Sequence, residues 1–214
     1  MFLTGGTGYL GRALATAMLQ LTHTVRALVR PGSEGRLPSG CIPVVGNALD
    51  QRSYAAHVAP ADTFLHLIGV SHPGPAKATQ FRTIDLASAR EAVQAALSAK
   101  VGHFVYVSVA HPAPVMKAYW EARVEAESLI EHARLNATIL RPWYVLGPGH
   151  RWPLVLKPFY WIAERIPATR DGARRLGLVT LGQMTAALVA AVEHPAKGIR
   201  VVEVPEIRGG RALP

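Results

Sequence analysis

A glycine-rich run near the start of the chain carries the strongest chemical signal. A short apolar segment leads into Thr4-Gly5-Gly6-Thr7-Gly8-Tyr9-Leu10-Gly11, and residues 11–20 are typical of a helix. Glycine permits a tight turn and close approach of a phosphate to the backbone, while the N-terminus of the following helix favours an anion. A strand, this turn and a helix in that order predict a dinucleotide-binding fingerprint.

The end of the next predicted strand, residues 24–29, indicates which dinucleotide is preferred. In dinucleotide-binding folds an acid at this place accepts a hydrogen bond from the ribose 2′-hydroxyl of NAD, whereas an arginine pairs with the 2′-phosphate of NADP. Here the strand is followed by Arg30, with no acid at its tip. We therefore predict NADP as the cofactor, with NAD as the alternative. The alternative interpretation of Arg30 is a solvated arginine at a strand end.

The elements that position these residues follow a regular alternation. Apolar runs alternate with helical patterns, which predicts βαβ units and one α/β domain over residues 1–214. We expect residues 147–177 to form a small substrate lobe and residues 205–214 a loose tail. Thr180 and Gln183 form a capping-box pattern that predicts a helix start. The predicted strands are residues 1–3, 24–29, 42–45, 63–68, 103–109, 138–140 and 200–204, and the predicted helices are residues 11–20, 81–99, 119–133 and 184–192.

Composition excludes several classes of protein. The formal net charge is +9, but lysine and arginine are spread along the chain, so we expect no nucleic-acid partner. The single cysteine indicates a reducing compartment, and no uncharged stretch is long enough for a transmembrane segment. Because the fingerprint strand begins at residue 2, we expect no targeting peptide and a cytoplasmic location. No cluster of His, Cys, Asp and Glu has the spacing of a metal site.

Five motifs, taken in order, resemble the short-chain dehydrogenase/reductase superfamily in its atypical or extended branch, which includes epimerase-like proteins. That resemblance implies a Rossmann-type, doubly wound parallel sheet of order 3-2-1-4-5-6 with one added strand and a small C-terminal substrate lobe. The motifs are the fingerprint, Gly46-Asn47-Ala48-Leu49-Asp50, Val105-Tyr106-Val107-Ser108, Tyr119-Trp120-Glu121-Ala122-Arg123, and the stretch from Leu140-Arg141-Pro142 to Gly147-Pro148-Gly149.

The resemblance also implies roles for individual residues. Ser108 matches the serine that polarises a substrate carbonyl, and Tyr119 matches the tyrosine that donates a proton to the carbonyl oxygen as hydride arrives. Arg123 lies at the third catalytic position. The cofactor-binding residues implied are the fingerprint, Asn47 and Ala48 at the adenine edge, Leu67, Ile68 and Gly69 beside the adenosine ribose, and Arg141 with Pro142 in the last motif.

Arg123 departs from the family pattern, which has a lysine four residues after the tyrosine. The family's lysine lowers the pKa of the tyrosine and holds the nicotinamide ribose. Arginine keeps the charge and the donors, but it stays protonated and cannot relay a proton. The sequence therefore leaves two NAD(P)-dependent functions open: hydride transfer to or from a small carbonyl or hydroxyl compound, and a non-catalytic NAD(P)-binding sensor or accessory protein. A third, less favoured function is that of a basic nucleic-acid or membrane-surface binder with a vestigial fold. Arg123, Glu127 and Glu131 also recur every four residues, as on an ordinary solvated helix face.

Aromatic residues gather in the predicted substrate lobe. Trp152, Phe159, Tyr160 and Trp161 lie close in sequence to His150 and Arg151. This composition is typical of a pocket for an apolar or ring-shaped small-molecule substrate. A peripheral membrane contact and an oligomer interface are the alternatives, because aromatic and cationic residues occur together at both.

Overall fold

The protein was analysed as a computed structural model. The structure describes residues 1–71, 73–112, 115–147 and 176–209. Most of the predicted substrate lobe therefore lies outside the described residues, including its aromatic cluster.

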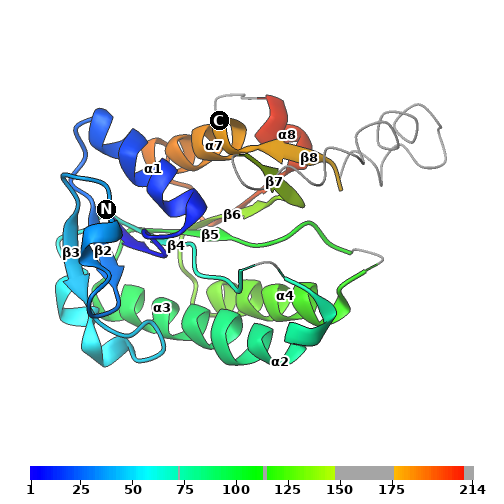
Figure 1. The fold of residues 1–214 in the computed structure, drawn as a ribbon, viewed down its shortest axis with the longest axis horizontal. Helices are drawn as coiled ribbons and strands as arrows, with labels where there is room; N and C mark the ends of the chain where they lie inside the picture. Colours follow the sequence, from blue (N-terminus) through cyan, green and yellow to red (C-terminus); the bar gives the residue numbers. More distant parts are fainter. Residues whose placement is uncertain (72, 113–114, 148–175, 210–214) are drawn as a thin grey trace.

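A seven-stranded parallel sheet forms the centre of the molecule (Figure 1). Its order is β3-β2-β1-β4-β5-β6-β9, which confirms the predicted fold class and strand order. Because all seven strands run in the same direction, their carboxyl ends share one edge of the sheet. The strands are β1 (Phe2–Thr4), β2 (Arg26–Val29), β3 (Ile42–Val45), β4 (Thr63–His66), β5 (His103–Val107), β6 (Ala137–Arg141) and β9 (Ile199–Glu203).

Helices cover both faces of the sheet (Figure 1). One face carries α1 (Tyr9–Gln20), α7 (Leu181–Glu193) and α8 (Val204–Gly209). The other carries α2 (Ala78–Gln80), a π-helical turn (Phe81–Leu86), α3 (Ala87–Ser98) and α4 (Lys117–His132). Short 3-10 helices lie in the connections between described elements: Glu34–Arg36, Gln51–Ser53, Ala55–His57 and Pro75–Lys77.

The alternation of side chains along the strands produces two cores. Phe2, Phe64 and Phe104 occupy adjacent register positions on β1, β4 and β5 and face the α3 side. Their rings lie in contact, with centroids 5.1 Å apart for Phe2–Phe64 and 5.3 Å for Phe64–Phe104. Leu3 and Leu65 are the next residues, so they face the α1 and α7 side. Burial on both faces explains why these strands read as continuous apolar runs in the sequence.

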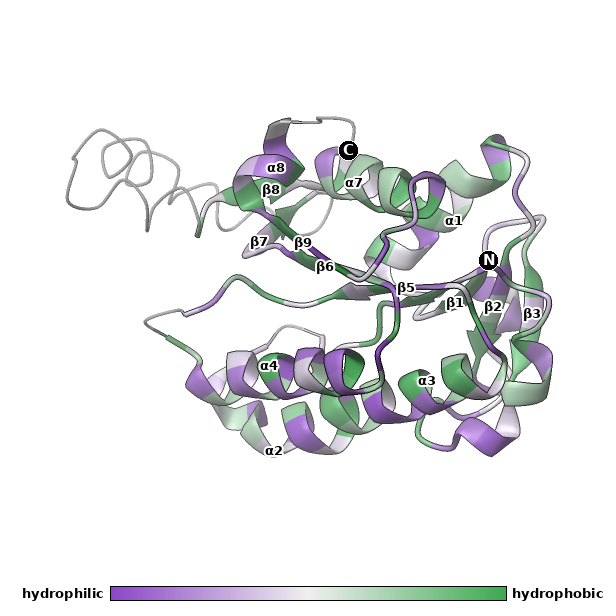
Figure 2. Ribbon diagram, turned by 180° about the vertical axis from the view of Figure 1, so that it is seen from behind, coloured by the Kyte–Doolittle hydropathy of each residue, from purple (hydrophilic) through white to green (hydrophobic). Residues whose placement is uncertain are grey.

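The helices α7 and α4 differ in hydropathy. In the hydropathy view, α7 is mostly pale green, whereas α4 carries many hydrophilic residues (Figure 2). The capping box at the start of α7 is confirmed: the Thr180 hydroxyl accepts from the Gln183 N–H, and the Gln183 side chain accepts from the Thr180 N–H. Within the described residues, no helix combines the length and the apolar character that a membrane span requires.

Several element boundaries differ from the predictions. A second, two-stranded parallel sheet, β7 (Tyr144–Leu146) with β8 (Leu178–Thr180), was not predicted, because three-residue strands leave almost no periodic signal. The expectation of a loose tail was wrong for residues 205–209, which belong to α8. Pro205 stands in its first turn, where proline is tolerated, and Ile207 is buried. Residues 210–214 lie outside the described residues.

Candidate active site

Most of the predicted cofactor-binding residues, together with Ser108, lie at the carboxyl ends of neighbouring parallel strands. This edge of an open α/β sheet is where ligands bind. Five groups follow five neighbouring strands: the fingerprint after β1, Arg30 after β2, Asn47 and Ala48 after β3, Leu67 to Gly69 after β4, and Ser108 after β5.

The fingerprint forms a tight turn between β1 and α1. Gly5 has a φ of +80°, and a Cβ there would lie 2.9 Å from the Leu67 carbonyl group. At Gly11 a Cβ would lie 2.2 Å from the Gly5 oxygen, so both positions require glycine. Gly8, the N-cap of α1, makes no side-chain capping bond, and the first turn contains no acid. The positive end of the helix is therefore suited to an anion such as a pyrophosphate.

A buried histidine lies directly beneath this turn. His66 is fully buried at the end of β4, where its Nδ1 is 2.8 Å from the Thr4 hydroxyl and its Nε2 is 3.3 Å from the Ser88 hydroxyl. Burial, together with the charge of Arg123, lowers the pKa of His66 to about 3. The ring is therefore neutral at physiological pH, and it links the fingerprint strand to α3. Sequence reasoning did not single out this residue.

Arg30 and Asn47 stand at neighbouring strand ends, since Val29 pairs with Val45. The Arg30 side chain is exposed. Asn47 is also exposed, but its Oδ1 accepts a hydrogen bond from the Leu49 N–H at 3.0 Å. The Asn47 side chain therefore also shapes its own turn. Contact of either residue with a cofactor stays a prediction.

Tyr119 and Arg123 lie on the face of α4 that is turned toward the sheet. The Arg123 guanidinium carbon is 5.4 Å from the centroid of the Tyr119 ring, and the Phe81 ring centroid is 5.0 Å from the same ring. Nearby, the Ser108 hydroxyl is buried and has no hydrogen-bond partner among the described residues. The fold thus brings Tyr119 against Arg123 and leaves a serine hydroxyl available after β5.

Arg123 is itself buried, with 5% exposure, so it does not belong to a solvated helix face. The solvated-face interpretation was also wrong for Glu127, which is 4% exposed, although Glu131 is exposed. Arg123 Nη2 donates to Asp85 Oδ2 at 2.8 Å, and Nη1 donates to the Tyr106 hydroxyl at 3.3 Å. Burial raises the pKa of Tyr106 to about 12, against the opposing charge of Arg123, so this hydroxyl stays neutral.

Asp85 is the functional candidate that the sequence did not reveal. It lies in the π-helical turn and is 1% exposed. Burial raises the pKa of its carboxyl group, and Arg123 and the Val70 N–H oppose that rise. In sequence it is one acid in a predicted helix, without motif or periodicity, so no local signal marks it.

Arg141 is engaged with two carboxylates. Its Nε donates to Glu127 Oε1 and its Nη1 to Glu203 Oε1, both at 3.1 Å. Pro142 is buried, and its carbonyl accepts from the Ala110 N–H at 2.9 Å. These contacts give both residues a structural role that ties β6 to α4, β9 and the segment after β5. Their predicted contact with a cofactor stays a prediction.

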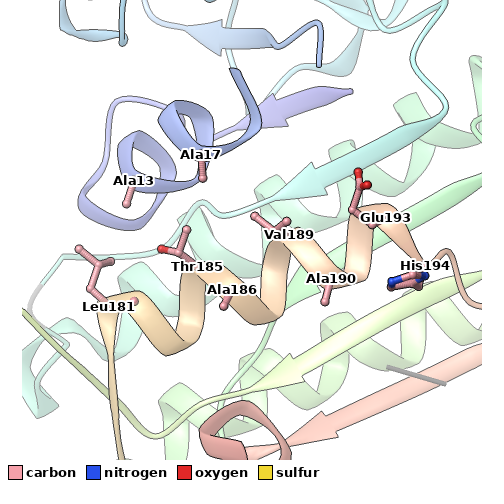
Figure 3. A pocket seen from close by; sticks show the side chains of 10 residues that line it. Ala13, Ala17, Leu181, Thr185, Ala186, Val189, Ala190, Glu193 and His194 are labelled. Atoms are coloured by element: carbon pink, nitrogen blue, oxygen red, sulfur yellow. The ribbon is translucent and has the colours of Figure 1, made fainter. Parts of the chain in front are cut away.

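Two hollows lie beside helices, one next to the start of α4 and one next to α1 and α7. The smaller, about 240 Å³, has Tyr119 on its wall together with Phe81, Met116 and Pro75. The larger, about 610 Å³, lies between α1 and α7 and is lined mainly by small apolar side chains such as Ala13, Ala17 and Ala186 (Figure 3). No predicted site residue lines the larger hollow, so it is separate from the candidate site. Among the described residues, no group of three or more His, Cys, Asp or Glu could hold a metal ion.

Comparison with known proteins identifies the family. Residues 5–151 match the model of a family described as NAD(P)H-binding. The chain belongs to this NAD(P)H-binding family. The match includes the glycine turn and the start of α1, and it does not decide the preference between NAD and NADP.

Two curated relatives are reductases. The chain is 27% identical over 210 residues to the ceramide reductase of Caulobacter vibrioides, covering 96% of this chain and 64% of the relative. It is 26% identical over 170 residues to the 4-hydroxy-2-methyl-3-oxo-4-farnesyl-3,4-dihydroquinoline-1-oxide ketoreductase of Stigmatella aurantiaca, covering 68% of this chain and 50% of the relative. The chain thus spans between half and two thirds of the length of these relatives.

The fold is shared with short-chain dehydrogenase/reductase and epimerase proteins. One example is a short-chain dehydrogenase/reductase superfamily protein from Agrobacterium tumefaciens with bound NAD, which superposes with a TM-score of 0.69 at 19% identity. The superposition covers 94% of this chain and 76% of that protein. This likeness confirms the predicted Rossmann-type architecture.

Proposed function

We propose that the protein is an NADP(H)-dependent oxidoreductase that transfers hydride to or from a small carbonyl or hydroxyl compound. The observation that carries this proposal is the contact of Tyr119 with the Arg123 guanidinium, at the sheet edge where the Ser108 hydroxyl, without a hydrogen-bond partner among the described residues, also lies. Membership in the NAD(P)H-binding family and the names of the two curated reductases support the same reaction class.

Each side chain has a distinct task in this proposal. Bound NADPH supplies the hydride. The Tyr119 hydroxyl donates a proton to the substrate oxygen, and the Ser108 hydroxyl donates a hydrogen bond to that same oxygen. Arg123 acts through its fixed positive charge, which favours negative charge on Tyr119 after the proton has left.

The residues present fit a dinucleotide. The glycine turn at Gly5 to Gly11 and the uncapped N-terminus of α1 would hold the pyrophosphate, because they combine close backbone approach with a positive helix end. Arg30, exposed at the tip of β2, would pair with the 2′-phosphate of NADP. Asn47 and Leu67 to Gly69 would line the adenosine part.

We propose a small, largely apolar carbonyl compound as the substrate. The hollow of about 240 Å³ beside Tyr119 supports this class, because Phe81, Met116 and Pro75 on its wall are apolar. The name of one curated relative includes a farnesyl substituent, and that of the other a ceramide, which fits an apolar substrate class.

One observation favours a second candidate function, that of a non-catalytic NAD(P)-binding sensor or accessory protein. The terminal nitrogens of Arg123 donate hydrogen bonds to protein groups: Nη2 donates to Asp85, and Nη1 donates to Tyr106 and to the Val107 carbonyl. An arginine held in this way has fewer donors for a ribose than the family's lysine.

The test starts with titration of the purified protein with NADPH and NADH, followed by tryptophan fluorescence. Oxidation of NADPH is then measured against a panel of quinones, ketones and aldehydes. The decisive variant is Tyr119→Phe, which removes only the hydroxyl group. The matched control is Tyr54→Phe, because the Tyr54 hydroxyl is buried in the core and makes no hydrogen bond to the described residues.

The expected result is NADPH binding with turnover that falls at least 100-fold in Tyr119→Phe, in line with the contribution of general acid catalysis, and stays at the wild-type level in Tyr54→Phe. Equal turnover in wild type and Tyr119→Phe would refute the role of Tyr119. Binding without oxidation of any compound would favour the sensor or accessory function.

A further inference from the structure

A buried ion pair, Asp85 with Arg123, lies next to the carboxyl ends of β4 and β5 at the candidate site. Asp85, in the π-helical turn, and Arg123, on α4, are 38 residues apart in the chain and nearly excluded from water. A buried pair of this kind is costly to break on one side, because the remaining charge is left without a partner. The pair therefore constrains the position of both side chains.

The two carboxylate oxygens of Asp85 accept hydrogen bonds from two different groups. Oδ2 accepts from Arg123 Nη2 at 2.8 Å, and Oδ1 accepts from the backbone N–H of Val70, also at 2.8 Å. Val70 directly follows the predicted cofactor loop, Leu67 to Gly69, which comes after β4. One carboxylate thus fixes both the loop and the arginine.

Arg123 extends this constraint to the neighbouring strand end. Its Nη1 donates to the Val107 carbonyl at 3.0 Å, directly before Ser108, and more weakly to the Ile68 carbonyl at 3.5 Å. The loop lies so close that a Cβ at Gly69 would be 2.3 Å from Nη2. The guanidinium carbon is also 5.4 Å from the Tyr119 ring centroid. The ends of β4 and β5 and the ring of Tyr119 therefore meet around one guanidinium group.

We propose that Asp85 is a positioning residue of the active site: it holds Arg123 so that the cofactor loop, Ser108 and Tyr119 keep one fixed relative arrangement. This role rests on the proposed function of Tyr119 and Ser108, and it assigns a task to a residue outside the five sequence motifs described above. Without the carboxylate, the guanidinium loses its counter-ion and turns away from the carbonyl groups of Ile68 and Val107.

Two substitutions at Asp85 separate its two tasks. Asp85→Asn keeps an oxygen for the Val70 N–H but places an amide donor against the guanidinium. We expect the NADPH Kd to stay within threefold of wild type, kcat to fall at least 10-fold, and the Val70 amide to keep its protection from hydrogen exchange. Asp85→Ala loses both bonds, so Val70 loses protection and the NADPH Kd rises as well.

The matched control is Thr138→Val. Thr138 is buried and bonds His103 at 3.0 Å, and both residues lie at the amino ends of their strands, away from the site. This variant loses a buried polar contact, as Asp85→Asn does, but should leave kcat, the NADPH Kd and exchange at residues 67–70 unchanged. If Asp85→Asn fails to fold, Asp85→Asn/Arg123→Gln replaces both charges, which avoids an unpaired buried ion. That double variant should fold, protect Val70 and remain at least 10-fold slower than wild type.

The outcomes are distinct. Wild-type kcat in Asp85→Asn, or wild-type kcat in the double variant, would overturn the positioning role. A wild-type protein that binds NADPH but never oxidises it would refute the proposed function instead. In that case, loss of Val70 protection and a weaker NADPH Kd in Asp85→Ala, with neither change in Thr138→Val, supports the role of Asp85 in holding the cofactor loop. Unchanged exchange and Kd in Asp85→Ala overturn it.

Discussion

Acid should destabilise this protein through His66 well before its carboxylates are protonated. The ring is fully buried between the Thr4 and Ser88 hydroxyl groups, and its pKa is lowered from 6.5 to about 3. A lowered histidine pKa means that the folded state requires the neutral ring. The stability it contributes is therefore fully present above pH 6.5 and is lost as the pH falls toward 3, because only the unfolded chain can take up the proton.

The size of the effect follows from these two pKa values. Between pH 7 and pH 5, linkage gives a loss of about 2 kcal/mol in the free energy of unfolding from His66 alone. His103 is also buried, with its pKa lowered to about 4, and it adds a loss of about 2 kcal/mol over the same range. Each loss is a substantial fraction of the stability of an ordinary domain, which is about 5–15 kcal/mol.

The assay is urea unfolding at pH 7 and pH 5 for wild type and His66→Asn. Asparagine does not titrate, and its amide stands near the position of Nδ1, so it keeps a partner for Thr4. The variant should lose about 2 kcal/mol less stability than wild type between the two pH values, whatever its stability at pH 7. His103→Asn serves as the matched comparison and should also lose about 2 kcal/mol less than wild type. An identical pH dependence in wild type and His66→Asn would refute the reasoning.

Three further changes test other parts of the structure. Arg30→Ala should weaken NADPH binding about 10-fold or more and leave the Kd for NADH unchanged, since a charge-assisted pair contributes about 1.5–3 kcal/mol. Arg90→Ala on α3 is the control, and an unchanged ratio of the NADPH and NADH Kd values in Arg30→Ala would contradict the selector role. Gly11→Ala places a Cβ 2.2 Å from the Gly5 oxygen and should abolish nucleotide binding in fluorescence titrations. Retained affinity would show that the backbone of the turn can shift to make room for the Cβ. Thr180→Ala removes the capping box and should cost about 1 kcal/mol in urea unfolding, and no loss would mean that packing alone fixes α7.

Local patterns in the sequence determined the fold and the cofactor class. The glycine fingerprint, the alternation of apolar runs with helical patterns and the Thr180 capping box each depend on residues close together in the chain. Residues such as Gly5 and Gly11 are recognisable because their backbone requirement leaves few alternatives. Each strand of the parallel sheet could therefore be predicted to within a few residues.

Only the tertiary structure decided what surrounds Arg123. Its contact with Tyr119 follows from a spacing of four residues, but Asp85 is 38 residues away, and no local pattern connects them. The pairing of Arg141 with Glu203, 62 residues apart, has the same origin. Whether a charged residue on a helix faces water or a buried partner depends on which surfaces the packed elements bring together, and that is a long-range property. The sequence by itself determined a dinucleotide-binding fold, and the packing of α4 against the sheet decided how its charged residues are used.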